Sequence, residues 1–352
     1  MYLAESPQII TLDAFFNKYA PIVKQKFKYL LDGNSYDITR YGVPYECKML
    51  SGPFEQFLNK YSTDIHLRKL LVGNLDELKA IIQEIIAFAP DFEKPLTKDK
   101  HKNELKKKSK PYIIEDINAL FNQIFVKEIY EDIKVFNKNE LIEWKGLEIC
   151  PYCGVKTIIP YDGPDNNTEK PQIDHYLPKS KFPFFAISYF NLFPVCTECN
   201  NFHNKGEHNP LTVDYREERL MHPYEFDRNA LSFEGKYTGA GDMNVNNFSV
   251  DVSYGDNRHR EGYNDVIAVE NKYKTFRKDI KNLYNKISKQ VAEKQVFQEY
   301  YGANLGDLSL NSNNFMLSVL GFEDTLDDAR TTEKHKFQID LFNSFITKLR
   351  KP

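Results

Sequence analysis

The chain has 352 residues, of which 41% are hydrophobic and 14% aromatic, so it can bury a substantial core and is expected to form about two domains. Its formal net charge is −3, which neither favours nor excludes a nucleic-acid partner, because such a partner would need only a local basic patch. No run of about 18 apolar residues occurs, and the first residues lack the pattern of a signal peptide, so we expect no membrane span and a cytoplasmic location.

The first 140 residues have the spacing of a helical domain. From Thr11, a suitable N-cap, apolar side chains recur every three or four residues as far as Leu31. Residues 32–45 contain Gly, Asn, Ser and Pro, a composition that is typical of a loop. We predict further helices over residues 53–71, 74–89 (with Asn74 as the N-cap) and 114–133.

A lysine-rich stretch, KDKHKNELKKKSK, separates the last two of these predicted helices. It spans residues 98–110 and holds seven lysines against two acidic residues. Such a run is either an exposed linker or an arm that contacts phosphates, and the sequence leaves both interpretations open.

Four of the five cysteines form two CxxC pairs, CPYC with Cys150 and Cys153, and CTEC with Cys196 and Cys199. In a reducing cytoplasm this arrangement favours metal binding over disulfides. Four thiolates suit tetrahedral Zn²⁺ and leave no open position, so we predict a structural zinc site. CPYC also occurs in redox proteins, but the second pair argues against redox catalysis. The remaining Cys47 is expected to be a small buried apolar side chain.

The 42 residues between the two pairs are too many for a simple zinc ribbon, so a further unit is inserted there. We predict a strand over residues 156–163, a turn-rich loop over 163–170 and an extended segment over 190–196. The second pair should begin a short helix within residues 196–205.

The C-terminal part predicts a β-hairpin followed by helix. Apolar and polar residues alternate around Leu231 and again from Phe248 to Tyr254, with the glycine-rich turn TGAGDMN between them. Apolar residues then step by three or four over residues 269–291, which indicates a helix. Its opposite face is either solvated or a second place where phosphates dock, and it carries Lys272, Lys274, Arg277, Lys278, Lys281 and Lys289.

The order of motifs around the cysteine pairs resembles the HNH (ββα-metal) endonuclease superfamily with a four-Cys zinc knuckle. The matching stretches are CPYC, then IDHYLPKS, NLFPVCTECN and NKG, over about 60 residues or about a sixth of the chain. The resemblance implies an α+β fold, mainly helical, with a central zinc-stapled ββα-metal (HNH) unit and a small β-hairpin region. It divides the chain into a helical N-terminal domain (1–140), the HNH unit (141–222) and a β-hairpin with a helical C-terminal region (223–352).

The same resemblance implies the catalytic residues. His175 would be the general base that deprotonates water, and histidine suits that role near neutral pH. Asp174 and Asn200 would hold a catalytic cation, and because their ligand atoms are oxygens this cation would be Mg²⁺ or Mn²⁺. Asn191 would hold the loop that carries the histidine in place.

The segment after the last cysteine departs from the family. Many relatives have C-N-x-x-K-G, whereas CNNFHNKG is two residues longer, so His203 or Asn204 could replace or join Asn200 as a cation ligand. Lys179 and Lys205 are expected to contact the substrate phosphate, or else to be surface lysines. The other residues have structural alternatives too: a histidine bonded to a backbone carbonyl, an aspartate in a turn and asparagines in a turn or at a helix cap.

These motifs predict a metal-dependent endonuclease acting on DNA, with sequence readout by the ββα unit expected to be poor because that unit enters the minor groove. The style of the motifs is also similar to effector nucleases of bacterial anti-phage systems of the Septu type, which work beside an ATPase partner. The chain has no phosphate-binding loop GxxxxGK[ST] of its own. Alternatives are an RNA-cutting HNH nuclease and a non-catalytic zinc-stabilised module that binds nucleic acid or scaffolds a complex. Double-strand cleavage would suit a homo-oligomer with an even number of sites.

Overall fold

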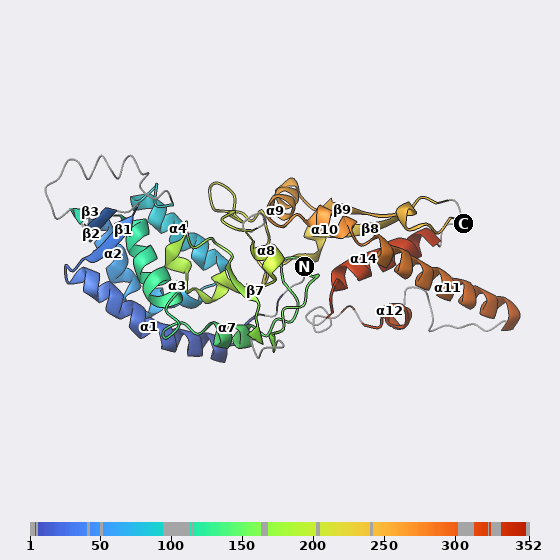
Figure 1. The fold of residues 1–352 in the computed structure, drawn as a ribbon, viewed down its shortest axis with the longest axis horizontal. Coiled ribbons are helices and arrows are strands. Elements are labelled where there is room, and N and C mark those ends of the chain that lie inside the picture. Colours follow the sequence, from blue (N-terminus) through green and yellow to red (C-terminus); the bar gives the residue numbers. More distant parts are fainter. Residues whose placement is uncertain are drawn as a thin grey trace.

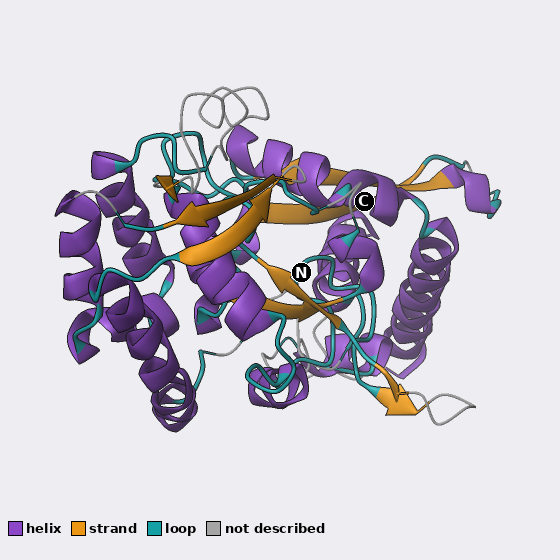
Figure 2. Ribbon diagram, turned by 60° about the vertical axis from the view of Figure 1, so that its left-hand side comes forward, coloured by secondary structure: helices purple, strands orange, loops and turns teal. Residues whose placement is uncertain are grey.

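The computed structural model describes residues 4, 6–40, 43–49, 52–93, 113–114, 116–162, 168–201, 205–239, 242–301, 313–322, 324 and 332–349. These residues form a mixed α and β protein that is mainly helical, which confirms the predicted class at that level (Figure 2). The molecule is elongated: helices α1 to α4 gather at one end, and β8, β9, α11 and α14 lie at the other (Figure 1). The lysine-rich stretch 98–110 lies outside the described residues.

The N-terminal half is built from helices around an aromatic core. Phe15, Tyr19, Phe27 and Phe125 are among its largest buried side chains. The helices, including a π-helix η1, are α1 (Ile9–Leu31), α2 (Gly52–Tyr61), α3 (Asp64–Val72), α4 (Leu75–Phe88), α6 (Ile117–Phe121), η1 (Asn122–Tyr130) and α7 (Lys138–Lys145).

The sequence predicted the start of α4 correctly but not the start of α1. Asn74 caps α4 in a capping box with Glu77, because each side chain bonds the other residue's backbone N–H. The prediction that Thr11 caps the first helix is wrong: the helix begins at Ile9, since the Gln8 carbonyl already accepts the N–H groups of Thr11 and Leu12. The predicted helix over 53–71 is two helices, α2 and α3.

Residues 36–40 and 43–47 pair as two strands, which corrects the predicted loop over 32–45. Strands β1 (Tyr36–Arg40) and β2 (Val43–Cys47) are antiparallel, and β3 (Ile113–Ile114) adds a parallel strand. Ile38 lies directly opposite Tyr45, and such a β-branched and aromatic pair stabilises neighbouring strands. This pairing outweighs the loop-like composition. Cys47 is fully buried at the end of β2, as predicted.

The central part contains short strands and turns. The predicted strand over 156–163 is reduced to a bridge between Ile149 and Thr157 and to a short strand, and a further short strand lies within the predicted loop over 163–170. The elements are the strands β4 (Tyr161–Asp162), β5 (Thr168–Glu169), β6 (Gln172–His175) and β7 (Leu192–Val195), the 3₁₀ helices η2 (Pro183–Phe185) and η3 (Tyr189–Asn191), and helix α8 (Thr197–Asn200). Helix α8 lies within the segment 196–205 where a short helix was predicted.

The C-terminal part confirms the predicted hairpin. Strands β8 (Leu231–Tyr237) and β9 (Phe248–Tyr254) pair antiparallel along their whole length, flanked by η4 (Arg228–Ala230) and η5 (Val245–Asn247). The helices are α9 (Asn257–Ile267), α10 (Val269–Lys274), α11 (Arg277–Tyr301), α12 (Asn313–Leu320) and α14 (His335–Leu349). The single helix predicted over 269–291 is therefore two helices, separated at Thr275 and Phe276.

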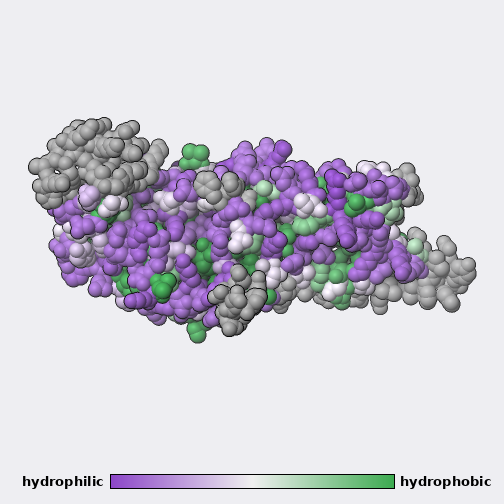
Figure 3. Space-filling model, in the orientation of Figure 1, coloured by the Kyte–Doolittle hydropathy of each residue, from purple (hydrophilic) through white to green (hydrophobic). Residues whose placement is uncertain are grey.

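Helix α14 covers one face of this hairpin at close range. Gly235 of β8 lies against Leu341 and Phe345, and a Cβ atom there would come within 2.4 Å of the Phe345 ring. A glycine is needed at this position because the helix packs on the bare strand backbone. On the view of Figure 3 hydrophilic residues dominate the surface, with scattered apolar ones. Within the described ranges, none of the helices combines the length and apolar character that crossing a membrane requires.

Candidate functional site

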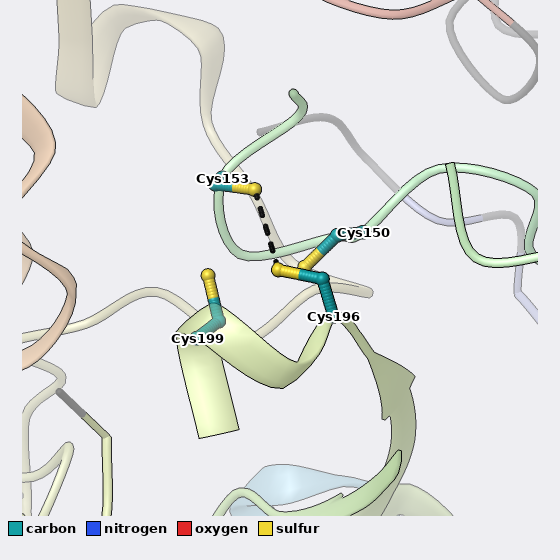
Figure 4. Close-up of side chains that lie close together, drawn as sticks. All are labelled: Cys150, Cys153, Cys196 and Cys199. Atoms are coloured by element: carbon teal, nitrogen blue, oxygen red, sulfur yellow. Dashed lines mark hydrogen bonds between the residues drawn. The ribbon is translucent and has the colours of Figure 1, made fainter. Parts of the chain in front are cut away.

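The four cysteines of the two CxxC pairs come together. Their Sγ atoms all lie within 4.8 Å of one another, and Cys153 Sγ is 4.0 Å from Cys196 Sγ (Figure 4). In a tetrahedral Zn²⁺ site with bonds of about 2.3 Å the sulfurs are about 3.8 Å apart. All four side chains are buried. The cluster therefore fits the predicted metal site, and an ion such as Zn²⁺ could be held there with no position left for water.

Local backbone structure presents the sulfurs. The turn that carries Cys150 and Cys153 closes through the bond from Gly154 N–H to Cys150 O (2.8 Å), and Gly154 adopts a φ of 63° that favours glycine. Cys196 immediately precedes α8, and Cys199 lies in its only turn (Figure 4). Hydrogen bonds from the other thiols, that of Cys150 first, hold the pKa of Cys153 well below its usual value, whereas burial raises the pKa of Cys150.

The C-terminal part contacts this cluster directly. Lys272 on α10 donates from Nζ to Cys199 Sγ (3.1 Å), and Tyr273 donates its hydroxyl to Cys153 O (2.6 Å). Burial lowers the pKa of Lys272, but the neighbouring Cys199 and Cys153 outweigh this effect and the pKa is raised. A four-thiolate zinc site carries excess negative charge, so a lysine bonded to one sulfur offsets part of it.

Asp174 and His175 lie at the end of the β6–β7 hairpin, where His175 pairs with Leu192. Their exposed fractions are only 5% and 6%. Tyr152, from the first CxxC turn, donates its hydroxyl to Asp174 Oδ2 (2.5 Å), and Lys205 Nζ lies 3.8 Å from the same oxygen. Burial raises the pKa of Asp174 although Lys205 and Tyr152 oppose the shift. The cysteine turn thus reaches the Asp-His pair through one side chain.

The His175 ring is held in one tautomer. Its Nε2 lies 3.0 Å from Ala186 O, and because a carbonyl only accepts hydrogen bonds, the proton is on Nε2. Burial lowers the pKa of His175 to about 3, with Lys179, Lys205 and other lysines adding to the effect. At neutral pH the ring is therefore neutral, and Nδ1 keeps a lone pair that can accept a proton.

Tyr130, the last residue of the π-helix η1, packs edge-on against His175 with a centroid distance of 4.5 Å. Two ammonium groups lie over its ring, those of Lys138 (4.6 Å) and Lys179 (4.9 Å). Lys179 also pairs with Glu131 at 3.2 Å. Two lysines thus lie over the tyrosine that packs on His175, and Glu131 neutralises one of them.

Asn191 is fully buried and clamps the loop that follows His175. Its Oδ1 accepts from Leu177 N–H (2.6 Å), and its Nδ2 donates to Leu177 O (3.1 Å) and Phe185 O (3.0 Å). The side chain thus satisfies three backbone groups of one loop, which fixes the path of the chain from His175 to Ala186.

Of the remaining predicted residues, Lys205 contacts the pair and Asn200 does not. Asn200 donates from Nδ2 to Gln172 Oε1 (2.9 Å), and Gln172 shares a face of β6 with Asp174. Among the described residues no hydrogen bond joins Asn200 to Asp174. His203 and Asn204 lie outside the described residues. Lys205 has no exposed surface and donates from Nζ to His175 O (3.0 Å), so it buttresses the pair from within the fold.

Three contacts of the site escaped prediction, among them that of Lys272, which the sequence placed only on a basic helix face. Tyr152 lies inside CPYC, so its proximity to the metal ligands was a usable signal, but nothing in the sequence tied it to Asp174. Tyr130 is 45 positions before His175, and Lys272 is 73 positions after Cys199; both belong to helices whose docking only the tertiary structure defines. Compared with known proteins, the chain matches no family model, no curated protein and no solved structure.

Proposed function

We propose that the chain is a metal-dependent endonuclease of the HNH (ββα-metal) type that hydrolyses phosphodiester bonds in DNA. One observation carries the proposal: the His175 ring, bonded through Nε2 to a backbone carbonyl, directly follows the buried Asp174 on a hairpin held by the four-cysteine cluster. General-base chemistry needs an unprotonated acceptor whose orientation is fixed. The Ala186 carbonyl fixes His175, and the Asn191 clamp fixes the loop that supplies this carbonyl.

The residues at the site divide the work as follows. His175 Nδ1 takes a proton from the attacking water, and the resulting imidazolium remains bonded to the Ala186 carbonyl through Nε2. The negative charge of an entering phosphate favours the protonated ring and raises the pKa of His175 from its value of about 3. Lys179, whose ammonium group lies over the Tyr130 ring that packs against His175, adds positive charge near the imidazole.

The oxygen donors near the pair fit a hard divalent cation. The Asp174 carboxylate and the Asn200 amide oxygen are ligand types that Mg²⁺ and Mn²⁺ accept. Such a cation supplies charge stabilisation for the scissile phosphate and the leaving oxygen. Asn200 and Asp174 lie on neighbouring elements, since Asn200 bonds Gln172 of the same strand. His203 and Asn204 remain the alternative ligands.

The wider context is part of the proposal. The similarity of the motifs to Septu-type effector nucleases supports a role in antiviral defence beside a partner ATPase, in the cytoplasm. A homodimer would provide two sites for cutting both strands. RNA remains an alternative substrate, because the same hydrolytic groups serve both nucleic acids.

A non-catalytic zinc module is the second candidate, and the low exposure of Asp174 and His175 favours it. Cleavage assays separate the two. Purified protein is incubated with plasmid, single-stranded DNA and total RNA, each with Mg²⁺ or Mn²⁺. Cleavage by the wild type that is lost in His175→Ala, at equal zinc content, supports the nuclease. Unchanged cleavage by His175→Ala refutes the assigned base.

His208→Ala is the matched control for these assays. His208 follows the second cysteine pair and is exposed, so its loss should leave both cleavage and stability unchanged. If the wild type cuts none of the substrates, the assay is repeated with the proteins that co-purify from its natural host. Inactivity in that setting too would favour the non-catalytic module.

A further inference from the structure

The first two turns of α11 carry a group of cations that have no acidic partner among the described residues. This basic triad consists of Arg277, Lys278 and Lys281. Positions 277 and 278 lie in the first turn, and 281 lies one turn further on, between them on the helix surface. Arg277 and Lys278 are exposed and Lys281 is half-exposed. The three charges therefore lie on adjoining parts of the exposed helix surface.

Three neighbouring basic residues are ion-paired, unlike the triad. Lys274 pairs with Glu270 (3.3 Å), Lys289 pairs with Glu293 (3.7 Å), and Lys334 pairs with Asp279 (2.6 Å). A neighbouring face of α11 is buried through Ile280, Ile287 and Val291. The helix is thus anchored by its apolar face and presents its unpaired charges to solvent.

The placement of the triad is also unfavourable for the helix itself. The N-terminal end of a helix carries a partial positive charge, so cations in the first turn are repelled and anions are favoured. Arg277 and Lys278 occupy this turn of a 25-residue helix together with Asp279, whose carboxylate is paired with Lys334. A bound anion would relieve both this repulsion and the repulsion among the three side chains.

A recess adjoins the triad on the side of the cysteine cluster. Its volume is about 470 Å³, and Thr275 and Phe276, the residues directly before the triad, form part of its wall. Its charged lining comprises Lys156, Lys272, Lys334, Glu198 and Glu333. Lys272 bonds Cys199 Sγ, so the recess and the triad are fixed to the same cluster that holds the Asp-His hairpin.

We infer that the basic triad binds the phosphodiester backbone of the nucleic acid that the site cuts. The inference rests on the proposed function, because it assigns the substrate's backbone to a surface outside the cutting site. Contacts to phosphates carry no base information, so binding through the triad is independent of sequence. Its strength falls steeply with salt, because each neutralised phosphate releases counterions.

The test compares two triple variants, each built on His175→Ala so that the probe stays intact. The first replaces the triad (Arg277→Gln, Lys278→Gln, Lys281→Gln). The control removes three lysines that are exposed and ion-paired at the other end of the molecule (Lys24→Gln, Lys28→Gln, Lys60→Gln). Both lower the net charge equally. Fluorescence anisotropy follows a labelled 30-mer duplex DNA, single-stranded DNA and RNA over a range of salt concentrations.

The triad variant should bind at least about tenfold more weakly at 0.1 M salt, and its slope of log K against log salt should be smaller by about 3. The control should match the His175→Ala parent within about twofold. Thermal unfolding checks the fold, and the triad variant should be no less stable, since it removes cations from a helix N-terminus.

Other results overturn the inference. These are equal slopes for the triad variant and the parent, a parent that binds no nucleic acid at low salt, and binding to phosphatidylserine vesicles but to no nucleic acid. Cleavage by the wild type separates the two proposals. A wild type that cuts while the triad variant binds normally refutes the triad alone. A wild type that never cuts while the triad variant loses binding refutes the nuclease alone.

Discussion

The clamp made by Asn191 yields the sharpest quantitative prediction. Replacing Asn191 with Ala removes three buried hydrogen bonds, two to the Leu177 backbone and one to Phe185 O. At about 1 kcal/mol each, the free energy of unfolding should fall by about 3 kcal/mol, and more if the stranded backbone groups find no water. The loop from His175 to Ala186 should loosen. The proposed nuclease activity should therefore fall even under conditions in which the variant is still fully folded.

Asn191→Asp should behave differently, because it keeps the shape of the side chain. The carboxylate can still accept from Leu177 N–H, but an oxygen now faces two carbonyl oxygens. The buried carboxyl therefore favours its protonated form, and its folded-state pKa rises above the unfolded value of about 3.9. Stability relative to wild type is greatest below that value and is lost as the pH rises through the folded-state pKa.

Urea unfolding followed by tryptophan fluorescence measures both variants. The chain has a single tryptophan, Trp144, whose carbonyl accepts a hydrogen bond from Tyr189 just before the clamp. Asn59→Ala is the matched control: Asn59 is exposed on α2 and makes one bond to Glu55 O, so its loss should change stability by less than about 0.5 kcal/mol. An Asn191→Ala protein as stable as this control would refute the reasoning.

The remaining predictions concern the metal cluster and two buried bases. Cys199→Ser removes one of four thiolates, so the zinc content measured by atomic absorption should fall from one ion per chain and the urea midpoint should fall with it; a variant that keeps both would contradict the shared site. Burial lowers the pKa of His222 to about 3 from 6.5, so only the unfolded state binds the proton between these values and stability is lost as the pH falls through that window. At pH 5 the free energy of unfolding is lower by about 2 kcal/mol because of this residue. Between pH 7.5 and 5 the free energy of unfolding of His222→Gln should therefore fall by about 2 kcal/mol less than that of wild type. An equal pH dependence of the two proteins would count against a neutral His222. Burial also holds the pKa of Lys145 well below its usual value, so the stability of wild type relative to Lys145→Met should rise from pH 7 to pH 9 in urea titrations, and a constant difference would show that Lys145 stays charged.

Features set by local sequence were predictable. The capping box at Asn74 depends on residues three positions apart, and the cysteine cluster depends on two CxxC spacings. The β8–β9 hairpin followed from alternation and a glycine-rich turn. In each case a short stretch of sequence contains the interaction, so its pattern indicates the structure before the tertiary fold is known.

Features set by tertiary pairing were not predictable. The hairpin at residues 36–47 has the composition of a loop, and only the pairing of Ile38 with Tyr45 overrides it. The same holds at the site. The bond of His175 to Ala186, the cover by Tyr130 and the bond of Lys272 to Cys199 join residues that no local pattern connects. Lys205 was expected to contact the substrate phosphate or to be a surface lysine. It lies in the interior instead, because Asp174 and the His175 carbonyl provide partners there.

The single-turnover cleavage rate of His175→Ala against wild type tests the central claim most directly. Both proteins are loaded with zinc and assayed with Mn²⁺ on the substrate that the wild type cuts, with His208→Ala alongside. Because a positioned general base contributes about 10²- to 10⁴-fold, the His175→Ala rate should fall by at least 10²-fold while His208→Ala retains the wild-type rate. A His175→Ala rate within a few-fold of wild type, in a protein with full zinc content and unchanged folding, would contradict the account.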